Sequence, residues 1–201
     1  MKLKNMLAAA SMAFLFTSAA HAENRIGLLA GVDINKVSFE TGSSDTAAGF
    51  MGGVFGQYDY NGNLFGEVQV RYISKGGDYS LPGVENSVTA NWLEIPVYAK
   101  YKFSSEKGFI PYVFAGPAIA LKLSSSGESL NTVSGVRTET SGGFNSLDLG
   151  LDFGLGAEYP IYGDFNLSLS AAYNLGLLDV ADVGTAQNRG FQIYAGVSMP
   201  Y

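Results

Sequence analysis

The stretch LDLGLDFGLGAEY, residues 147–159, decides the fold class. Every odd-numbered position in it is apolar, whereas every even-numbered position is Asp, Glu or Gly. A period of two residues is typical of a β-strand whose two faces meet different surroundings. Strands of globular proteins are usually about 5–6 residues long. Because the alternation here continues over thirteen residues, it predicts an unusually long strand.

Similar segments recur along the chain. Together with 147–159 they predict eight strands, the others being residues 26–38, 49–60, 64–74, 93–103, 109–122, 165–177 and 191–201. Residues 49–60 and 109–122 are apolar or small at almost every position. The pattern therefore predicts strands there but leaves their register open.

The predicted connections alternate between short and long. Three are turns of a few residues, and Asn61-Gly62-Asn63 contains the Asn-Gly pair typical of hairpins. The other four are polar segments predicted as loops: residues 40–48, 76–90, 123–145 and 178–188. Short turns at one end and long loops at the other indicate an antiparallel meander with both termini at the short-turn end. That is the layout of an outer-membrane β-barrel.

The apolar face points inward in a soluble barrel and outward in a membrane barrel. Here the opposite face carries Gly, Ser, Asn, Gln and a few charges, which suits the narrow interior of an eight-stranded barrel. Strands of eleven residues or more are long enough to cross a bilayer at a tilt, and aromatic residues flank the short turns as in an interfacial girdle. We predict an all-β, eight-stranded antiparallel up-and-down transmembrane β-barrel. A soluble, lipocalin-like periplasmic barrel that binds a ligand is an alternative.

Charged residues of both signs lie on the polar face. Because an uncompensated buried charge costs several kcal/mol, we expect these residues to form a structural network inside the barrel: Glu67, Arg71, Glu94, Lys100, Lys102, Asp148, Asp152 and Glu158.

The N-terminus resembles a secretory signal peptide. Lys2 and Lys4 precede an apolar stretch that ends in Ala20-His21-Ala22, an A-x-A-like cleavage site. We therefore predict a cleaved leader over residues 1–22 and one barrel domain over residues 23–201. Cleavage removes the only histidine and leaves 10 basic against 18 acidic residues.

The composition argues against catalysis. The chain has no cysteine, and without His21 it has no histidine to activate a serine. Asp148 and Asp152 are four residues apart on one strand, which separates them by about 13 Å, too far to act on one bond. Gly154-x-Gly156 lacks the helix that a dinucleotide site requires. We expect no catalytic residues, no metal site and no cofactor, and the negative charge disfavours nucleic acid as a partner.

Four segments carry a family resemblance: WLEIPVYAKYKF, PYVFAGP, LDLGLDFGLGAEY and LSLSAAYNLGL. They resemble strand motifs of the bacterial outer-membrane β-barrel domain family, which includes OmpX-like and PorT-like proteins. The resemblance implies an integral outer-membrane protein that is secreted across the inner membrane. The last strand, with Phe191, Val197, Met199 and Tyr201, resembles the C-terminal signal that the outer-membrane insertion machinery reads. The family usually ends in Phe, so Tyr201 is a departure, as is Pro200.

The function expected from the sequence is a structural or surface-interaction role, in envelope integrity or adhesion. Its expected partners are outer-membrane lipid and lipopolysaccharide. The predicted loops hold one basic residue, Arg137, and eight acidic ones: Glu40, Asp45, Asp78, Glu85, Glu128, Glu139, Asp179 and Asp182. Such loops either engage an extracellular partner or simply keep the surface hydrated. A narrow ion or small-solute channel is the other alternative.

Overall fold

The computed structural model describes residues 24–39, 42–43, 47–81, 84–104, 108–131, 134–140, 145–177 and 186–201. The predicted signal peptide lies outside these residues. Among them the chain forms ten strands: β1 (Arg25–Phe39), β2 (Gly42–Ser43), β3 (Ala47–Asp59), β4 (Leu64–Leu81), β5 (Val84–Lys102), β6 (Ile110–Asn131), β7 (Arg137–Thr140), β8 (Leu147–Pro160), β9 (Asn166–Gly176) and β10 (Ala186–Pro200).

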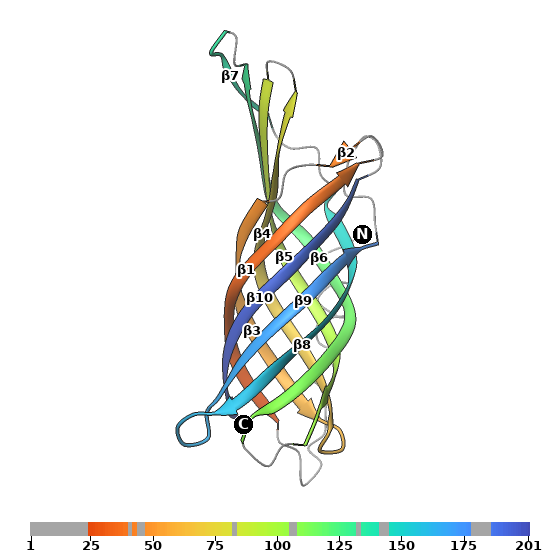
Figure 1. Ribbon diagram of the computed structural model, residues 1–201, viewed down its shortest axis with the longest axis vertical. Coiled ribbons are helices and arrows are strands. Elements are labelled where there is room, and N and C mark those ends of the chain that lie inside the picture. The colour runs from red at the N-terminus through yellow and green to blue at the C-terminus, as the bar shows by residue number, and fades with distance from the viewer. Residues whose placement is uncertain are drawn as a thin grey trace, which may run out of the picture.

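Eight of the strands close into an antiparallel barrel (Figure 1). Each pairs with the next along the chain, in the order β1, β3, β4, β5, β6, β8, β9 and β10. The last strand returns to the first, with pairs that run from Arg25↔Pro200 to Phe39↔Ala186. Closure leaves no open edge around the barrel wall, as a strand structure in lipid requires. The predicted eight-stranded up-and-down barrel is confirmed.

The short turns and the ends of the barrel domain lie at one end, as predicted. The β3–β4 turn is held by its own polar side chains. Asp59 Oδ1 accepts a hydrogen bond from Gly62 N at 2.6 Å, and Asn61 Oδ1 accepts one from Leu64 N at 2.9 Å. Gly62 has a φ of 81°, which explains the glycine at this turn. At the same end, Tyr201 N donates to Asn24 O at 3.2 Å.

The prediction of loops over residues 76–90 and 123–145 is wrong for most of these residues. Strands β4 and β5 stay paired to Leu81↔Val84, and β6 stays paired with β5 to Asn131. β7 then pairs with β6, from Gly127↔Thr140 to Leu130↔Arg137. These parts of β4, β5 and β6, with β7, form a sheet that rises above the barrel (Figure 1). We call residues 76–81, 84–90, 124–131 and 137–140 the protruding sheet.

Composition explains why the sequence pattern missed this sheet. Its strands carry Ser, Thr, Asn, Glu and Gly at odd and even positions alike, as in VENSVTA and SSSGESLN. Both faces stand clear of the barrel, so neither needs to be apolar. Strands without two unlike faces show no two-residue hydrophobic period.

The apolar face of the barrel strands points outward. In β8, Leu151, Phe153 and Leu155 are 39%, 45% and 63% exposed, while Asp152 between them is fully buried. The same alternation continues in β9 and β10. A soluble lipocalin-like barrel requires the opposite orientation. The described residues contain no helix with the length and hydropathy needed to cross a membrane.

In β3 and β6, whose register the sequence pattern left undetermined, inward and outward residues alternate as in the other barrel strands. In β3, Met51, Phe55 and Gln57 face inward, and in β6 the inward residues include Tyr112 and Phe114. Among their outward neighbours, Val54 and Val113 are 47% and 43% exposed.

Candidate functional site

A chain of polar side chains fills the barrel interior at the short-turn end. Lys102 Nζ donates to Glu158 Oε2 at 2.7 Å, and Lys100 forms an ion pair with Glu67. Gln57 joins the two carboxylates, because its Nε2 donates to Glu67 Oε2 at 2.8 Å and to Glu158 Oε1 at 3.2 Å. Each charge in this layer therefore meets an opposite charge or an amide.

Gln69 connects this layer to a second one near the middle of the barrel. Gln69 Nε2 donates to Glu67 Oε1 at 2.6 Å, and its Oε1 accepts from Arg71 Nη1 at 3.1 Å. The Arg71 guanidinium also donates to Glu94 Oε1 from Nε at 2.8 Å and to Asp152 Oδ2 from Nη2 at 3.0 Å. Arg71 is fully buried. Such a group is stable inside a barrel only when its donors are satisfied.

The acids around Arg71 have further donors. Lys75 Nζ donates to Glu94 Oε2 at 2.9 Å. Tyr98 Oη and Asn174 Nδ2 each donate to Asp152, to Oδ2 and Oδ1 respectively, both at 2.5 Å. The result is one connected network from Lys102 to Lys75, which we call the polar ladder.

The structure places all the sequence-predicted network residues on the inner face. Of these, Glu67, Arg71, Glu94, Lys100, Lys102, Asp152 and Glu158 belong to the polar ladder. Asp148 is 3% exposed and lies within electrostatic reach of Lys75. The predicted network did not include several other members of the buried polar interior, namely Arg25, Asp33, Gln57, Gln69, Lys75 and Gln192, although the strand alternation puts Asp33, Gln69 and Gln192 on the polar face. The alternation of these residues with outward-facing residues was the signal in the sequence that could have identified them.

A layer of buried aromatic side chains fills part of the barrel interior beside the polar ladder. Phe55, Tyr112, Phe114 and Tyr194 are at most 5% exposed. Lys100 Nζ lies 4.3 Å from the centroid of the Tyr112 ring, a cation–π contact. A cavity beside Phe55, Tyr112 and Tyr194 measures about 10 Å³, the space of about one water molecule. Glycine makes room for the rings, since a Cβ on Gly156 would lie 2.5 Å from Tyr112 Oη.

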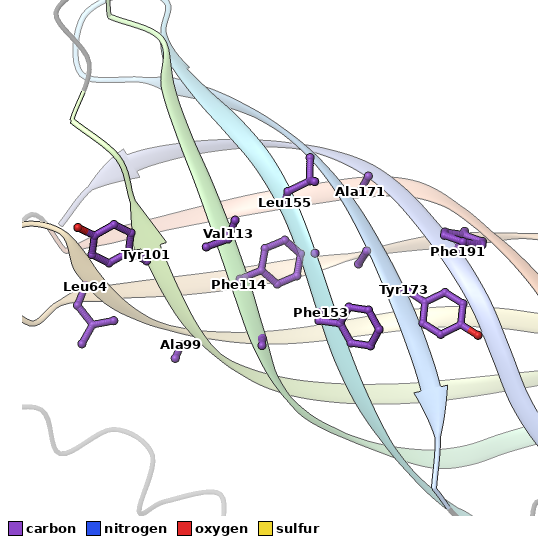
Figure 2. A pocket seen from close by; sticks show the side chains of 13 residues that line it. Leu64, Ala99, Tyr101, Val113, Phe114, Phe153, Leu155, Ala171, Tyr173 and Phe191 are labelled. Carbon is purple, nitrogen blue, oxygen red and sulfur yellow. The ribbon is translucent and has the colours of Figure 1, made fainter.

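A second hollow lies outside, on the lipid-facing surface (Figure 2). Its volume is about 680 Å³, and small outward residues such as Ala99 and Ala171 border it. On one side the rings of Phe153, Tyr173 and Phe191 stand in a row, with centroids 5.4 Å and 5.0 Å apart.

The residues that resemble a C-terminal insertion signal lie on the same outer surface. Phe191, Val197, Met199 and Tyr201 are 59%, 40%, 47% and 74% exposed. Their reading by an insertion machinery stays a prediction.

The protruding sheet carries part of the predicted acidic surface. Asp78, Glu85, Glu128 and Glu139 lie on its strands. Arg137 Nη1 and Glu128 Oε1 form an exposed ion pair at 2.5 Å. No strand in the described part of the chain pairs with the second edge of β7. The other four acidic residues, Glu40, Asp45, Asp179 and Asp182, lie outside the described residues.

The described residues contain no group of three or more His, Cys, Asp or Glu side chains that could hold a metal ion. In the described interior, the side chains of the polar ladder are joined to one another by ion pairs and hydrogen bonds.

Comparison with solved structures finds similar barrels. Neisserial surface protein A has a TM-score of 0.52 and 20% identity, over 88% of this chain and 97% of that one. The outer membrane enzyme PagL has a TM-score of 0.50 and 13% identity, over 88% and 99%. Ail, the attachment invasion locus protein of Yersinia pestis, has a TM-score of 0.46 and 13% identity, over 88% and 99%. Identities this low show a shared fold alone. A search of curated proteins finds no match.

The family comparison is more specific. A model of the outer membrane protein beta-barrel domain matches residues 18–182, which is most of the sequence. This match agrees with the closed barrel, with the outward orientation of the apolar face and with the strand motifs that resemble those of the family. The chain belongs to the outer membrane protein beta-barrel domain family.

Proposed function

We propose that this protein is a closed, non-catalytic barrel that anchors an acidic protruding sheet on the cell surface, where the sheet binds basic partners. The observation that carries the proposal is the sheet itself, four strands that continue above a barrel already complete without them. A barrel that served the envelope only as a rigid span would not need them.

The chemistry of the sheet indicates the kind of partner. Four acidic residues lie on its strands against one arginine, Arg137. Opposite charge steers a basic partner towards such a surface and speeds association at low ionic strength. The second edge of β7 adds backbone donors and acceptors to which an extended segment can bind. Outer-membrane lipid and lipopolysaccharide surround the barrel in this proposal, and the insertion machinery acts during assembly.

The polar ladder supports a closed barrel over the alternative of a channel. Within the described residues, one cavity between its side chains and the aromatic layer, beside Lys100 and Tyr112, measures about 10 Å³. A hydrated ion needs far more room than one water molecule occupies.

The test is a charge-neutral sheet on an unchanged barrel. The variant carries Asp78→Asn, Glu85→Gln, Glu128→Gln and Glu139→Gln, all outside the polar ladder. Binding of the folded protein in lipid nanodiscs to immobilised polylysine is measured at low and at physiological salt. We expect the wild type to bind, and the variant to lose at least tenfold in affinity.

A matched control separates binding from assembly. Glu158→Gln removes one acid of the polar ladder inside the barrel and leaves the sheet unchanged. The migration shift between unheated and heated samples on a gel reports whether each variant has folded. Equal binding by the wild type and by the folded four-residue variant would refute the proposal.

A further inference from the structure

The hollow on the lipid-facing surface follows a diagonal path up the barrel wall. It begins beside Leu64 and Tyr101, at the short-turn end of β4 and β5, and it ends beside Tyr173 and Phe191 (Figure 2). Leu64 is the first residue of β4, whereas Phe191 lies near the middle of β10. The hollow therefore rises from one end of the barrel towards its middle. We call it the outer hollow.

Two rows of outward residues form the sides of the outer hollow. Backbone pairing joins the members of each row across neighbouring strands. The first row is Leu64, Tyr101, Val113, Leu155 and Ala171, and the second row is Ala99, Ala115, Phe153, Tyr173 and Phe191. The rows lie two positions apart on the strands that they share, and the residues between them, such as Phe114 and Ala172, are buried. The two rows therefore bound a groove that runs across the strands.

Alanine residues keep this groove open. Three strands place an alanine in one row and a larger side chain in the other: Ala99 with Tyr101, Ala115 with Val113, and Ala171 with Tyr173. Each larger side chain therefore lacks a neighbour of its own size across the groove. An unfilled space forfeits the dispersion contacts of the atoms that line it. An apolar occupant restores these contacts.

The dimensions of the groove match one leaflet of a bilayer. The first row crosses five strands, and thus four inter-strand spacings, which is a length of about 19 Å. Membrane strands tilt by about 45°, so a groove that crosses them at a right angle rises about 13 Å along the barrel axis. Half of the hydrocarbon core is about 15 Å. Because short turns are periplasmic in barrels of this kind, the groove covers the depth of the periplasmic leaflet.

We propose that the outer hollow binds one acyl chain of a phospholipid from the periplasmic leaflet, extended between the two rows. The hollow lies within the apolar surface that faces lipid, so acyl chains reach it directly. Among the side chains that line it, Tyr101 and Tyr173 alone carry a polar atom, which suits hydrocarbon and not a polar ligand. The proposal concerns the barrel wall and is independent of the protruding sheet.

A second copy of the chain fits this groove poorly. Two barrels in one membrane form a closed pair about a two-fold axis along the membrane normal. Their facing grooves incline in the same sense by about 45°, so they cross each other at about 90°. A row of side chains on one copy therefore cannot lie along the groove of the other. An acyl chain is flexible and follows the incline.

The test measures whether the purified barrel retains lipid. The protein is extracted from its membrane in a mild detergent and analysed by native mass spectrometry. We expect the wild type to carry one phospholipid per barrel. A variant with Ala115→Leu and Ala171→Leu fills the groove from both rows, so it should lose nearly all of the bound lipid.

A matched control makes the same two changes elsewhere on the outer surface. Ala30 and Ala195 are exposed and face each other in the β1–β10 pairing. A variant with Ala30→Leu and Ala195→Leu should therefore retain its phospholipid. The heat-modifiable gel shift shows whether each variant has folded.

A second measurement varies the acyl chain alone. Palmitoyl and octanoyl lysophosphatidylethanolamine share a headgroup, but the shorter chain fills only part of the groove. Each is titrated into the protein in detergent, and unfolding is followed by the fluorescence of Trp92, the only tryptophan and 1% exposed. A ligand that binds only the folded state raises the unfolding midpoint with its concentration. The palmitoyl lipid should raise the midpoints of the wild type and the control more than the octanoyl lipid does, and should leave the groove-filling variant unchanged.

Other results would overturn the proposal. If the groove-filling variant retains as much phospholipid as the wild type, the lipid binds elsewhere on the barrel. If the wild type carries no lipid and both lysolipids shift its midpoint equally, no acyl chain resides in the outer hollow. A dimer mass that the wild type shows and the groove-filling variant lacks would assign the outer hollow to a second copy.

Discussion

Replacing Arg71 by methionine tests how much the polar ladder contributes to stability. Methionine fills a similar volume but leaves Glu94 and Asp152 without the guanidinium donors that lie 2.8 Å and 3.0 Å away. Breaking a buried ion pair from one side costs about 3–5 kcal/mol. Here Glu94 keeps Lys75, and Asp152 keeps Tyr98 and Asn174. We therefore expect a loss at the lower end, about 3 kcal/mol.

The assay is urea unfolding of the folded barrel in lipid vesicles, followed by the fluorescence of Trp92. The midpoint should fall while the slope stays constant, because the surface exposed on unfolding is unchanged. Adding Asp152→Asn to Arg71→Met removes one stranded charge, so the double variant should be more stable than the single one. A loss below about 1 kcal/mol, the value of an exposed pair, would refute this account of the interior. So would a double variant whose two losses simply add.

Four further predictions follow from the barrel geometry. Leu155→Arg, on the lipid face at 63% exposure, should destabilise the barrel by about 2–4 kcal/mol if it lies near the bilayer midplane, whereas Leu155→Phe should be tolerated in the same urea assay. Leu151→Cys should react in intact membranes with a lipid-permeant thiol reagent only, and ready labelling by a charged reagent would contradict its outward orientation. Gly156→Val should prevent the heat-modifiable gel shift, because its Cβ would lie 2.4 Å from Leu169 O. The wild type should give a flat current trace in planar bilayers, and resolved single-channel steps would show that the interior opens.

The sequence was sufficient for the barrel because two kinds of surroundings alternate along each strand. In 147–159 the pattern assigns Asp148, Asp152 and Glu158 to one face, and the structure shows that this face is the inner one. The two-residue pattern failed to predict the protruding sheet, because both faces of that sheet meet the same surroundings. Strand length above the barrel therefore depends on backbone pairing, such as Leu81↔Val84, and not on hydrophobic contrast.

Which side chains pair with each other in the polar ladder could not be predicted from the sequence, for a different reason. Arg71 and Asp152 are 81 positions apart, and they meet because β4 and β8 lie across the barrel from one another. Gln57 and Gln69 carry no charge, so nothing in their composition marks them as the links between ion pairs. Lys75 falls on the inward register of β4, four residues after Arg71, but it lies at the edge of a segment predicted as a loop.

More than one layer of side chains fills the described interior of the barrel. The number of strands fixes the bore of a small barrel, so only the residues that fill it decide whether a path exists. Two layers fill it at different heights, the Arg71 layer near the middle and the aromatic layer with Tyr112 and Tyr194 beside Lys100. A path needs both to open, and shortening Arg71 leaves the rings in place. Opening a path would therefore require changes in both layers, and we take this as support for the proposed role of the protruding sheet.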